Sequence, residues 1–356
     1  MGKKPFRFIQ VGCGARAEMW DKVIFRNNDK LTTVAYVNRT IEKAKRFSSY
    51  HPELNILYFS DIEEALRNVE ADGVLMVTPP DVHKEQIATI AKYKLPILAE
   101  KPLTDTLDEA IETMKIVEDA NIPMSISLQF RYLPVSQEIK RLCETRELGK
   151  PGFGFFGYFR NRNGMRADLN KYPLKMVHPM LLEQTIHHFD LIRYCYNSEP
   201  VWIETHTWNP EWSMYAHDSN VMTMMELENG MRVNYFGTWT GGYNGPKEIM
   251  FEWRTDCDNG IILQKEPFED LNKAKMNDPE IKSCNLPDFK AFMDDTELLI
   301  LEFADAVQNK KPVPCDGWDH INSLAMVFAS IESTEQGKRV YMKEFLNRNG
   351  VKQRQK

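Results

Sequence analysis

The 356-residue chain lacks several features that would place it in a specialised class of proteins. Its six cysteines contain no C-x-x-C pair, so the pattern indicates neither a zinc knuckle nor a redox dithiol, and free buried thiols are the simplest interpretation. No stretch reaches the roughly 18 uninterrupted apolar residues of a membrane-spanning helix. The N-terminus shows no long apolar signal region with a small-residue cleavage site. We therefore expect a soluble, cytoplasmic protein without a membrane partner.

Runs of like charge, internal repeats and low-complexity tracts are also missing. The formal net charge is only -6, which predicts no nucleic-acid partner and no attraction to an anionic membrane. The content of 42% apolar and 27% charged residues is that of an ordinary globular protein. A chain of this length usually exceeds what one hydrophobic core serves, so two domains are expected.

Short apolar runs alternate with helical patterns in the first third of the chain, as in parallel βαβ units. Two helix starts are predicted from capping boxes, Ser60-x-x-Glu63 and Thr106-x-x-Glu109. The expected strands are Phe6 to Val11, Thr33 to Val37, Val74 to Val77, Pro96 to Ala99 and Met124 to Leu128. The sequence therefore predicts an α/β fold whose residues 1–128 form a doubly wound, parallel Rossmann domain.

A different pattern begins at residue 129. After a predicted helix from about Met180 to Tyr196, turn signals at 228–230 and 258–260 separate strand-like segments, and Asn-Gly is a strong hairpin signal. Residues 265–296 are polar and contain three prolines, which predicts an irregular surface segment. Residues 129–356 are thus expected to form a second α/β domain with a large, mostly antiparallel open sheet.

A glycine-rich turn follows the first predicted strand and opens a helix. Gly12-Cys13-Gly14-Ala15-Arg16-Ala17 matches G-x-G-x-x-A in the context that dinucleotide binding requires. The first glycine permits a tight turn, the second lets the backbone approach a pyrophosphate, and the alanine allows close packing of helix and strand. The alternative is a glycine-rich turn without a ligand, which the surrounding βαβ signals disfavour.

The end of the second predicted strand bears on the choice of cofactor. An acidic residue there accepts the ribose 2'-hydroxyl of NAD, whereas this chain has Asn38 followed by Arg39. A guanidinium beside a neutral amide suits a 2'-phosphate, which slightly favours NADP. NAD remains possible, with Asn38 binding the ribose through its amide and Arg39 pointing to solvent.

Three further motifs are Thr78-Pro79-Pro80-Asp81-Val82-His83, Leu98-Ala99-Glu100-Lys101-Pro102-Leu103 and Gln184-Thr185-Ile186-His187-His188-Phe189-Asp190. With them the sequence resembles the glucose-fructose oxidoreductase and inositol dehydrogenase family, Gfo/Idh/MocA, over nearly the whole chain. The resemblance implies a catalytic Lys101, often with a cis bond to the following proline, and association as homodimers or homotetramers through the open sheet. The expected cofactor-binding residues are Gly12, Cys13, Gly14, Ala15, Arg16, Asn38, Arg39, Thr78, Pro79, Pro80, His83, Glu100, Lys101 and Gln129.

Physical arguments independently favour two groups for proton transfer. Lys101 follows the predicted strand Pro96 to Ala99, at the sheet edge where ligands bind in open α/β folds, although most lysines are simply exposed. Glu183, His187 and Asp190 recur at helical spacing, so a carboxylate lies one turn from an imidazole that would accept the proton of an alcohol. The family resemblance assigns this role to His187, with an aspartate at the position of Glu183.

Other interpretations of the same residues stay open. No metal site is expected, because a third ligand and the H-E-x-x-H order are missing. A structural, hydrogen-bonded histidine is the other alternative, and it fits His188 better than His187. Gln129 and Arg131 either meet the ligand or tie the domains together. Several aromatic residues present faces for a sugar ring or belong to the core or an interface, namely Tyr158, Trp208, Trp212, Trp239 and Tyr243.

The leading hypothesis is an NAD(P)-dependent oxidoreductase that acts on a secondary alcohol of a sugar, sugar derivative or cyclitol. In it Lys101 and His187 handle the hydroxyl proton, and Glu183 supports His187. One alternative is a glycosidase that uses tightly bound NAD for transient oxidation and elimination. Another is a non-catalytic sensor of a nucleotide or sugar, which would need no proton-transfer groups.

Overall fold

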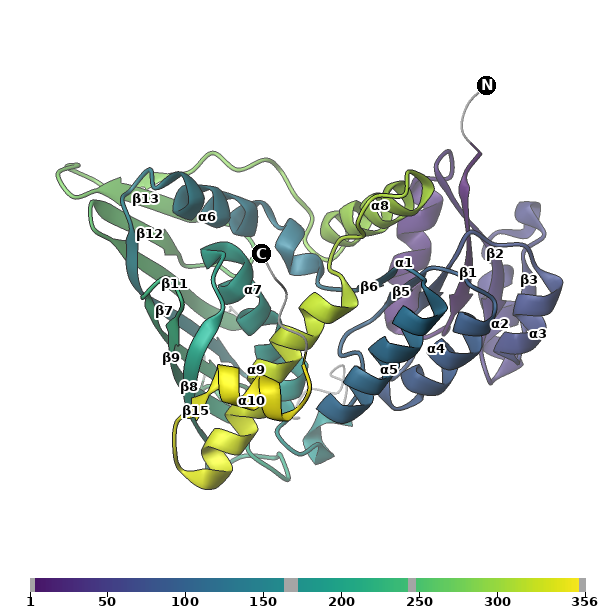
Figure 1. The fold of residues 1–356 in the computed structure, drawn as a ribbon. Helices are drawn as coiled ribbons and strands as arrows, with labels where there is room; N and C mark the ends of the chain where they lie inside the picture. The colour runs from purple at the N-terminus through teal and green to yellow at the C-terminus, as the bar shows by residue number, and fades with distance from the viewer. Residues whose placement is uncertain (1–3, 163–171, 243–247, 352–356) are drawn as a thin grey trace. The chain divides into compact units, whose positions relative to one another are not determined.

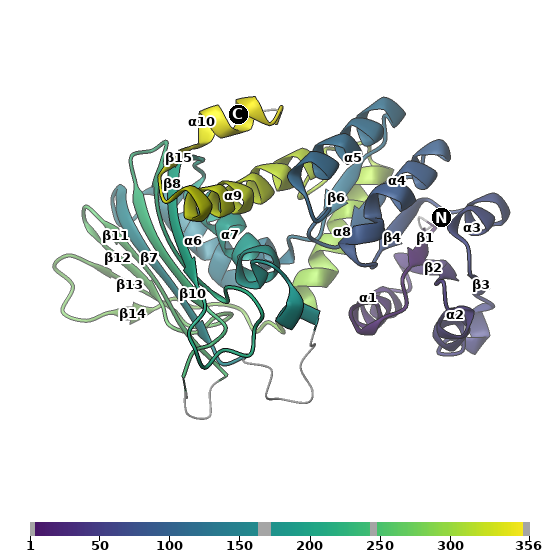
Figure 2. The ribbon, with the colours of Figure 1, turned by 90° about the horizontal axis from the view of Figure 1, so that it is seen from below.

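The computed structural model of this chain describes residues 4–162, 172–242 and 248–351. The chain forms two compact units, traced from purple to yellow in Figures 1 and 2. The first contains the chain up to Tyr132 together with Lys290–Ile321, and the second contains Leu133–Phe289 and the chain from Asn322 to near its end. The sequence-based division into residues 1–128 and 129–356 does not include this return of residues 290–321 to the first unit.

The first unit is a Rossmann domain built on a six-stranded parallel sheet. The strands run in the order β3-β2-β1-β4-β5-β6, the dinucleotide-binding arrangement with its reversal of strand order beside β1. They are β1 (Phe6–Val11), β2 (Leu31–Val37), β3 (Leu57–Phe59), β4 (Gly73–Met76), β5 (Ile97–Ala99) and β6 (Met124–Ile126). The helices are α1 (Ala15–Arg26), α2 (Ile41–Ser48), α3 (Ile62–Asn68), α4 (His83–Lys92), α5 (Leu107–Ala120) and α8 (Asp294–Gln308).

Helix α8 joins this unit because its apolar face completes the core beside β1. The ring of Phe303 lies 6.4 Å from the rings of both Phe6 and Phe8, and all three side chains are buried. Trp20 and Ile24 of α1 belong to the same buried cluster. Burial of this apolar surface is the main force that holds a distant segment against the sheet.

Two details of the first unit differ from the sequence-based predictions. Strand β3 was not predicted, because it has only three residues at the sheet edge, and Leu57 and Tyr58 are exposed. Helix α3 is capped by Asp61, whose carboxylate accepts a hydrogen bond from the Glu64 amide (2.8 Å), so the Ser60 box was wrong by one residue. The Thr106 cap of α5 is confirmed.

The second unit is built on a nine-stranded sheet in the order β14-β13-β12-β11-β7-β10-β9-β8-β15. The sheet is mostly antiparallel, as predicted, and β7 and β10 form a parallel pair. The strands are β7 (Pro151–Arg160), β8 (Pro200–Trp208), β9 (Asn220–Leu227), β10 (Arg232–Thr238), β11 (Ile249–Cys257), β12 (Gly260–Gln264), β13 (Leu271–Lys275), β14 (Lys282–Ser283) and β15 (Val340–Tyr341).

One face of this sheet is covered by helices, as Figure 1 shows for α6 (Pro134–Thr145) and α7 (Ile186–Tyr196). Helix α9 (Gly317–Gln336) bonds to β8 through Ser333, whose hydroxyl accepts from the Thr205 amide at 2.9 Å. Helix α10 (Met342–Arg348) ends the described fold. Among the described residues, no helix combines the length and the apolar character needed to cross a membrane.

The turns of the second unit fit the sequence, whereas one segment does not. Gly230 has a φ of +83° in the predicted hairpin between β9 and β10, where glycine is favoured. The segment 265–296 was predicted to be irregular, yet it contains β13 and β14. These are short, polar strands at the sheet edge, which lack the apolar alternation that predicts a strand.

Candidate functional site

The glycine turn between β1 and α1 has the geometry of a phosphate cradle. Gly12 has a φ of +101°, and a Cβ there would lie 2.2 Å from the carbonyl oxygen of Val77, so only glycine fits. Gly14 is exposed, and a Cβ on it would meet nothing within 4 Å. Gly14 is also the N-cap of α1, so no side chain caps the helix and its first amides face the open side of the turn.

A hydrogen bond between Cys13 and Asn38 holds this turn in place. The Cys13 amide donates to Oδ1 of Asn38 at 3.2 Å, and Nδ2 of Asn38 donates to the carbonyl of Thr40 at 3.0 Å. The thiol of Cys13 is buried, which raises its pKa to about 12. Asn38 therefore ties the glycine turn to the end of β2, and Arg39 beside it is exposed.

Arg16 connects three elements at the same edge of the sheet. Its Nε donates to the carboxylate of Glu100 at 2.6 Å, directly after β5. The amide of Gln129, oriented with its nitrogen toward the Ser127 carbonyl (2.9 Å), accepts from Nη2 of Arg16 at 3.1 Å. The structure thus brings Arg16 together with two predicted cofactor-binding residues that lie 84 and more positions away from it in the sequence.

The segment around Thr78 is held by a buried histidine. The two ring nitrogens of His83 lie 2.9 Å from the carbonyl oxygens of Thr78 and Leu103, and burial lowers the pKa of the ring. Pro79 precedes a short 3-10 helix, Pro80–Val82, that leads into α4. His83 therefore joins the turn after β4 to the loop after β5, and its contact with a nucleotide stays a prediction.

Lys101 follows Glu100 at the carboxyl end of β5 and is half-buried. Its peptide bond to Pro102 is cis, as the family resemblance implies. The Leu103 amide donates to Nε2 of His320 at 3.2 Å, which anchors the loop from a residue 217 positions away. The sequence offered no signal for His320, because nothing in its local pattern indicates this partner.

The second unit carries Glu183 and His187. Met180–Thr185 is a π-helix that continues into α7, so the prediction of a regular α-helix through Glu183 was wrong. A π turn changes the angular spacing of side chains and is frequent at functional sites. His187 is buried, with 8% of its surface exposed, and Glu183 is half-buried.

His188 is the structural histidine that the sequence predicts. Its ring nitrogens lie 2.9 Å from the Tyr235 hydroxyl and 3.0 Å from Nε2 of Gln184. Burial lowers the pKa of this ring to about 3, so it is neutral at physiological pH. The rings of Phe156 and Tyr158 lie against it, at 4.7 Å and 4.8 Å between centroids.

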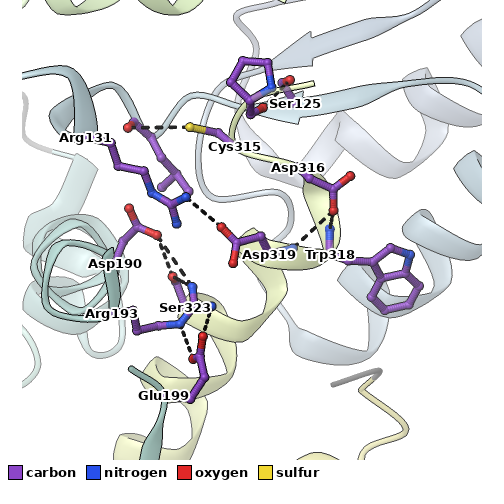
Figure 3. Close-up of polar contacts among 12 residues, drawn as sticks. Ser125, Arg131, Asp190, Arg193, Glu199, Cys315, Asp316, Trp318, Asp319 and Ser323 are labelled. Carbon is purple, nitrogen blue, oxygen red and sulfur yellow. Dashed lines mark hydrogen bonds and ion pairs between the residues drawn. The ribbon is translucent and has the colours of Figure 1, made fainter. Parts of the chain in front are cut away.

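Asp190 is anchored rather than presented to a ligand, as Figure 3 shows. Its carboxylate accepts a hydrogen bond from the Ser323 hydroxyl at 2.8 Å. Ser323 in turn accepts from Arg193 at 2.7 Å, and Arg193 donates two bonds to Glu199 at 2.6 and 2.8 Å. The network fixes α7, the helix that carries His187.

The remaining predicted residues have mixed environments. Arg131 forms an ion pair with Asp319 at 2.7 Å, a contact within the first unit (Figure 3). Tyr158 and Trp239 are buried, whereas Trp208 and Trp212 are exposed. Tyr243 lies outside the described residues. All six cysteines are free thiols, of which Cys257 and Cys284 are half-buried and the other four buried.

Within the described ranges no group of three or more His, Cys, Asp or Glu side chains is placed to hold a metal ion. Two arginines without a predicted role lie at the end of the aromatic strand β7: Arg160 is its last residue, and Arg162 lies two residues later. The available sequence signal was the R-x-R pattern after an apolar, aromatic segment.

Comparison with known proteins covers most of the chain. Residues 6–127 match the family model described as an oxidoreductase family with an NAD-binding Rossmann fold, and residues 136–260 match the GFO/IDH/MocA C-terminal domain. The chain is 25% identical over 292 residues to scyllo-inositol 2-dehydrogenase (NAD(+)) of Bacillus subtilis strain 168, covering 80% of this chain and 82% of the relative.

Two solved structures share the fold of both units. An oxidoreductase from Agrobacterium radiobacter, in complex with NAD+, L-tartaric acid and magnesium, matches with a TM-score of 0.85 at 17% identity over 96% of this chain and 99% of that one. The WlbA dehydrogenase from Bordetella pertussis, in complex with NADH and UDP-GlcNAcA, matches with a TM-score of 0.77 at 17% identity over 95% and 98%.

Proposed function

Because the chain belongs to the Gfo/Idh/MocA family of oxidoreductases, we propose that it is an NAD(P)-dependent dehydrogenase of a sugar, sugar derivative or cyclitol. The observation that carries this proposal is the position of Lys101. It follows the carboxyl end of β5, on the sheet edge that also bears the glycine turn, and ligands of open α/β sheets bind at this edge. The name of the Bacillus relative supports a cyclitol or a similar polyol.

The residues of the first unit fit a dinucleotide. The exposed Gly14 and the uncapped start of α1 accept a pyrophosphate, while Arg16, Glu100 and Gln129 form a polar cluster next to Lys101. When bound, the nicotinamide supplies the site that accepts or donates hydride. The protein contributes orientation and proton transfer.

Proton transfer at the substrate hydroxyl is assigned to Lys101 and His187. An ammonium group donates a hydrogen bond to the hydroxyl oxygen, and a neutral imidazole accepts the proton as the alcohol becomes a carbonyl. Glu183, in the π turn before α7, is the carboxylate proposed to support His187. The buried His188 has both ring nitrogens engaged within the second unit and takes no part in this transfer.

NADP is the proposed preferred cofactor. The end of β2 carries no carboxylate to repel a 2'-phosphate, since Asn38 is bonded to Cys13 and Thr40. The exposed Arg39, which follows Asn38 in the sequence, has no acidic partner among the described residues and is proposed to bind the phosphate.

The proposed enzyme is cytoplasmic and forms a homodimer or homotetramer through the open face of its large sheet.

The test is a panel of neutral and acidic sugars, sugar derivatives and cyclitols, each assayed at the nicotinamide absorbance with NAD and with NADP. Oxidation of at least one member of the panel is expected. A panel without turnover, together with release of product from a glycoside in the absence of added cofactor, would reject the dehydrogenase in favour of an oxidation and elimination mechanism.

Replacement of the proton-transfer groups tests their roles. Lys101→Ala and His187→Ala should each lower kcat by roughly 100-fold to 10,000-fold, because general acid-base catalysis contributes about this much. Nucleotide binding, measured by fluorescence titration, should stay nearly unchanged. Lys92→Ala and His206→Ala replace exposed residues of the same types and serve as controls. Full activity in either site variant contradicts the assignment.

A further inference from the structure

Two arginines stand at the end of β7 in the second unit, where the strand leaves a core of aromatic residues. The guanidinium of Arg160 donates to Glu248 through Nε at 2.6 Å and also through Nη2, so its charge is balanced. Arg162 lies two residues later, and its amide donates to the Trp239 carbonyl at 2.8 Å. Its guanidinium lies over the buried Trp239 ring, 4.5 Å from the ring centre.

The half-buried Arg162 differs from the buried Arg193 of the same unit in having no ion-pair partner among the described residues. Its Nε is buried without a hydrogen-bond partner, and no carboxylate among the described residues lies within ion-pair distance. Arg193, by contrast, is satisfied by Glu199 and Ser323. Burial and the nearby charge of Arg160 lower the pKa of Arg162, an effect that Glu183 opposes from a distance. A buried unpaired charge is unfavourable unless a ligand completes it.

The surroundings of Arg162 adjoin the proposed substrate site. Tyr215, Tyr158 and Glu183, which lies four residues before His187, are near enough to Arg162 to oppose the lowering of its pKa. The Tyr158 hydroxyl lies 3.4 Å from Oε1 of Gln184 in the same π turn. The Tyr215 hydroxyl donates to the carbonyl of Arg162 and holds its backbone in place. The open guanidinium therefore lies beside the turn that carries Glu183.

We infer that Arg162 binds the carboxylate of an acidic substrate, so that the enzyme acts on a sugar acid, a uronate or aldonate, rather than on a neutral polyol. This inference rests on the proposed function, because it names the substrate class of the same site. A guanidinium binds a carboxylate through two parallel hydrogen bonds. A carboxylate fits better than a phosphate, because Arg160 is already balanced by Glu248 and Arg162 alone offers one positive charge.

The experiment compares a neutral hexose, the corresponding uronic acid and the corresponding 6-phosphate as substrates of the full-length protein, with each cofactor. The wild type should show a kcat/KM for the uronate about 100-fold above that for the hexose, since hydrogen bonds to charged groups provide this much. Arg162→Met should lose this factor for the uronate alone, and Arg162→Lys should recover part of it. Arg254→Met is the control, because Arg254 lies in the same sheet with its charge paired to Asp256.

Three results would overturn the inference. They are a wild type that prefers the hexose, a wild type that prefers the 6-phosphate, and an Arg162→Met variant that loses activity equally on hexose and uronate. The melting temperature of the Arg162→Met variant distinguishes a ligand-binding role of Arg162 from a structural one. Removal of an uncompensated buried charge should leave the melting temperature unchanged or higher, whereas a structural arginine would lower it on replacement.

Binding without turnover separates this inference from the proposed function. Calorimetric titration of the nucleotide-loaded protein with uronate should show binding that Arg162→Met weakens by about 100-fold. If uronate binds in this way but no substrate is oxidised, the carboxylate site stands and the dehydrogenase fails. If neutral polyols are oxidised and uronate does not bind, the dehydrogenase stands and the carboxylate site fails.

Discussion

Asn38 and Arg39 are adjacent residues with different roles at the end of the second strand. The amide of Asn38 is bonded on both sides, to Cys13 and to Thr40, and so holds the glycine turn. Arg39 is exposed at the point where the second strand ends. At the scale of the residue, we therefore expect the choice between a 2'-hydroxyl and a 2'-phosphate to depend on a single guanidinium.

Replacement of Arg39 tests this choice. Arg39→Ala should raise the dissociation constant of NADP by about 10-fold to 100-fold and that of NAD by less than threefold, because only NADP carries the phosphate that a guanidinium binds. Fluorescence titration of both nucleotides measures the two constants. Arg67→Ala is a matched control, since Arg67 is exposed on α3 and paired with Glu63. Equal losses for both nucleotides would rule out the phosphate contact.

The start of α1 is the element on which cofactor binding depends, and its two glycines have different roles. Gly12 is required by the fold, since its φ is +101° and the Val77 carbonyl fills the space of a Cβ. Gly14 is not required by the fold, because a Cβ there meets open space and its φ of -96° suits any residue. We therefore expect Gly14 to be needed for the ligand only.

A pair of substitutions separates the two roles. Gly12→Ala should lower the free energy of unfolding by about 2 kcal/mol or more, from the strained φ and the backbone clash. Gly14→Ala should leave the free energy of unfolding within about 0.5 kcal/mol of the wild type but weaken nucleotide binding at least 10-fold. Urea denaturation and nucleotide titration measure the two effects. A Gly14→Ala variant that binds nucleotide normally would show that the pyrophosphate does not approach this residue.

At the scale of the whole molecule, the nine-stranded sheet has one face that no helix of the described residues covers (Figures 1 and 2), and this face is rich in large apolar side chains. Phe153, Met222, Met224 and Met250 are each more than 40% exposed on β7, β9 and β11, while the alternate residues of the same strands are buried. An exposed apolar surface of this kind indicates an interface. A second copy of the chain is the proposed partner.

Disruption of this face tests the assembly. Met222→Glu combined with Met224→Glu should convert the wild-type oligomer to a monomer, because buried like charges repel across a symmetric interface. Light scattering after size-exclusion chromatography gives the mass. Met276→Glu introduces the same charge at an exposed methionine beyond the end of β13 and is the control. A monomeric wild type would contradict the proposed interface.

The local sequence determined much of this protein. Apolar runs and glycine spacing were sufficient to predict five strands of the Rossmann sheet, the glycine turn and the β9–β10 hairpin, because these depend on neighbouring residues and backbone sterics. The family motifs indicated Lys101 and the cis bond to Pro102. The short edge strands β3, β13 and β14 were not predicted, because tertiary pairing rather than local propensity forms them.

Only the tertiary structure decided which distant residues meet. Arg16 joins Glu100 and Gln129, the Leu103 amide reaches His320, and α8 returns to cover β1, each through contacts between segments far apart in the chain. The balance of charge around Arg160 and Arg162 is a fact of the same kind. The local sequence does not distinguish the two arginines. Packing pairs Arg160 with Glu248 and leaves Arg162 without a carboxylate partner among the described residues. The physical reason is that burial and pairing are properties of three-dimensional neighbours.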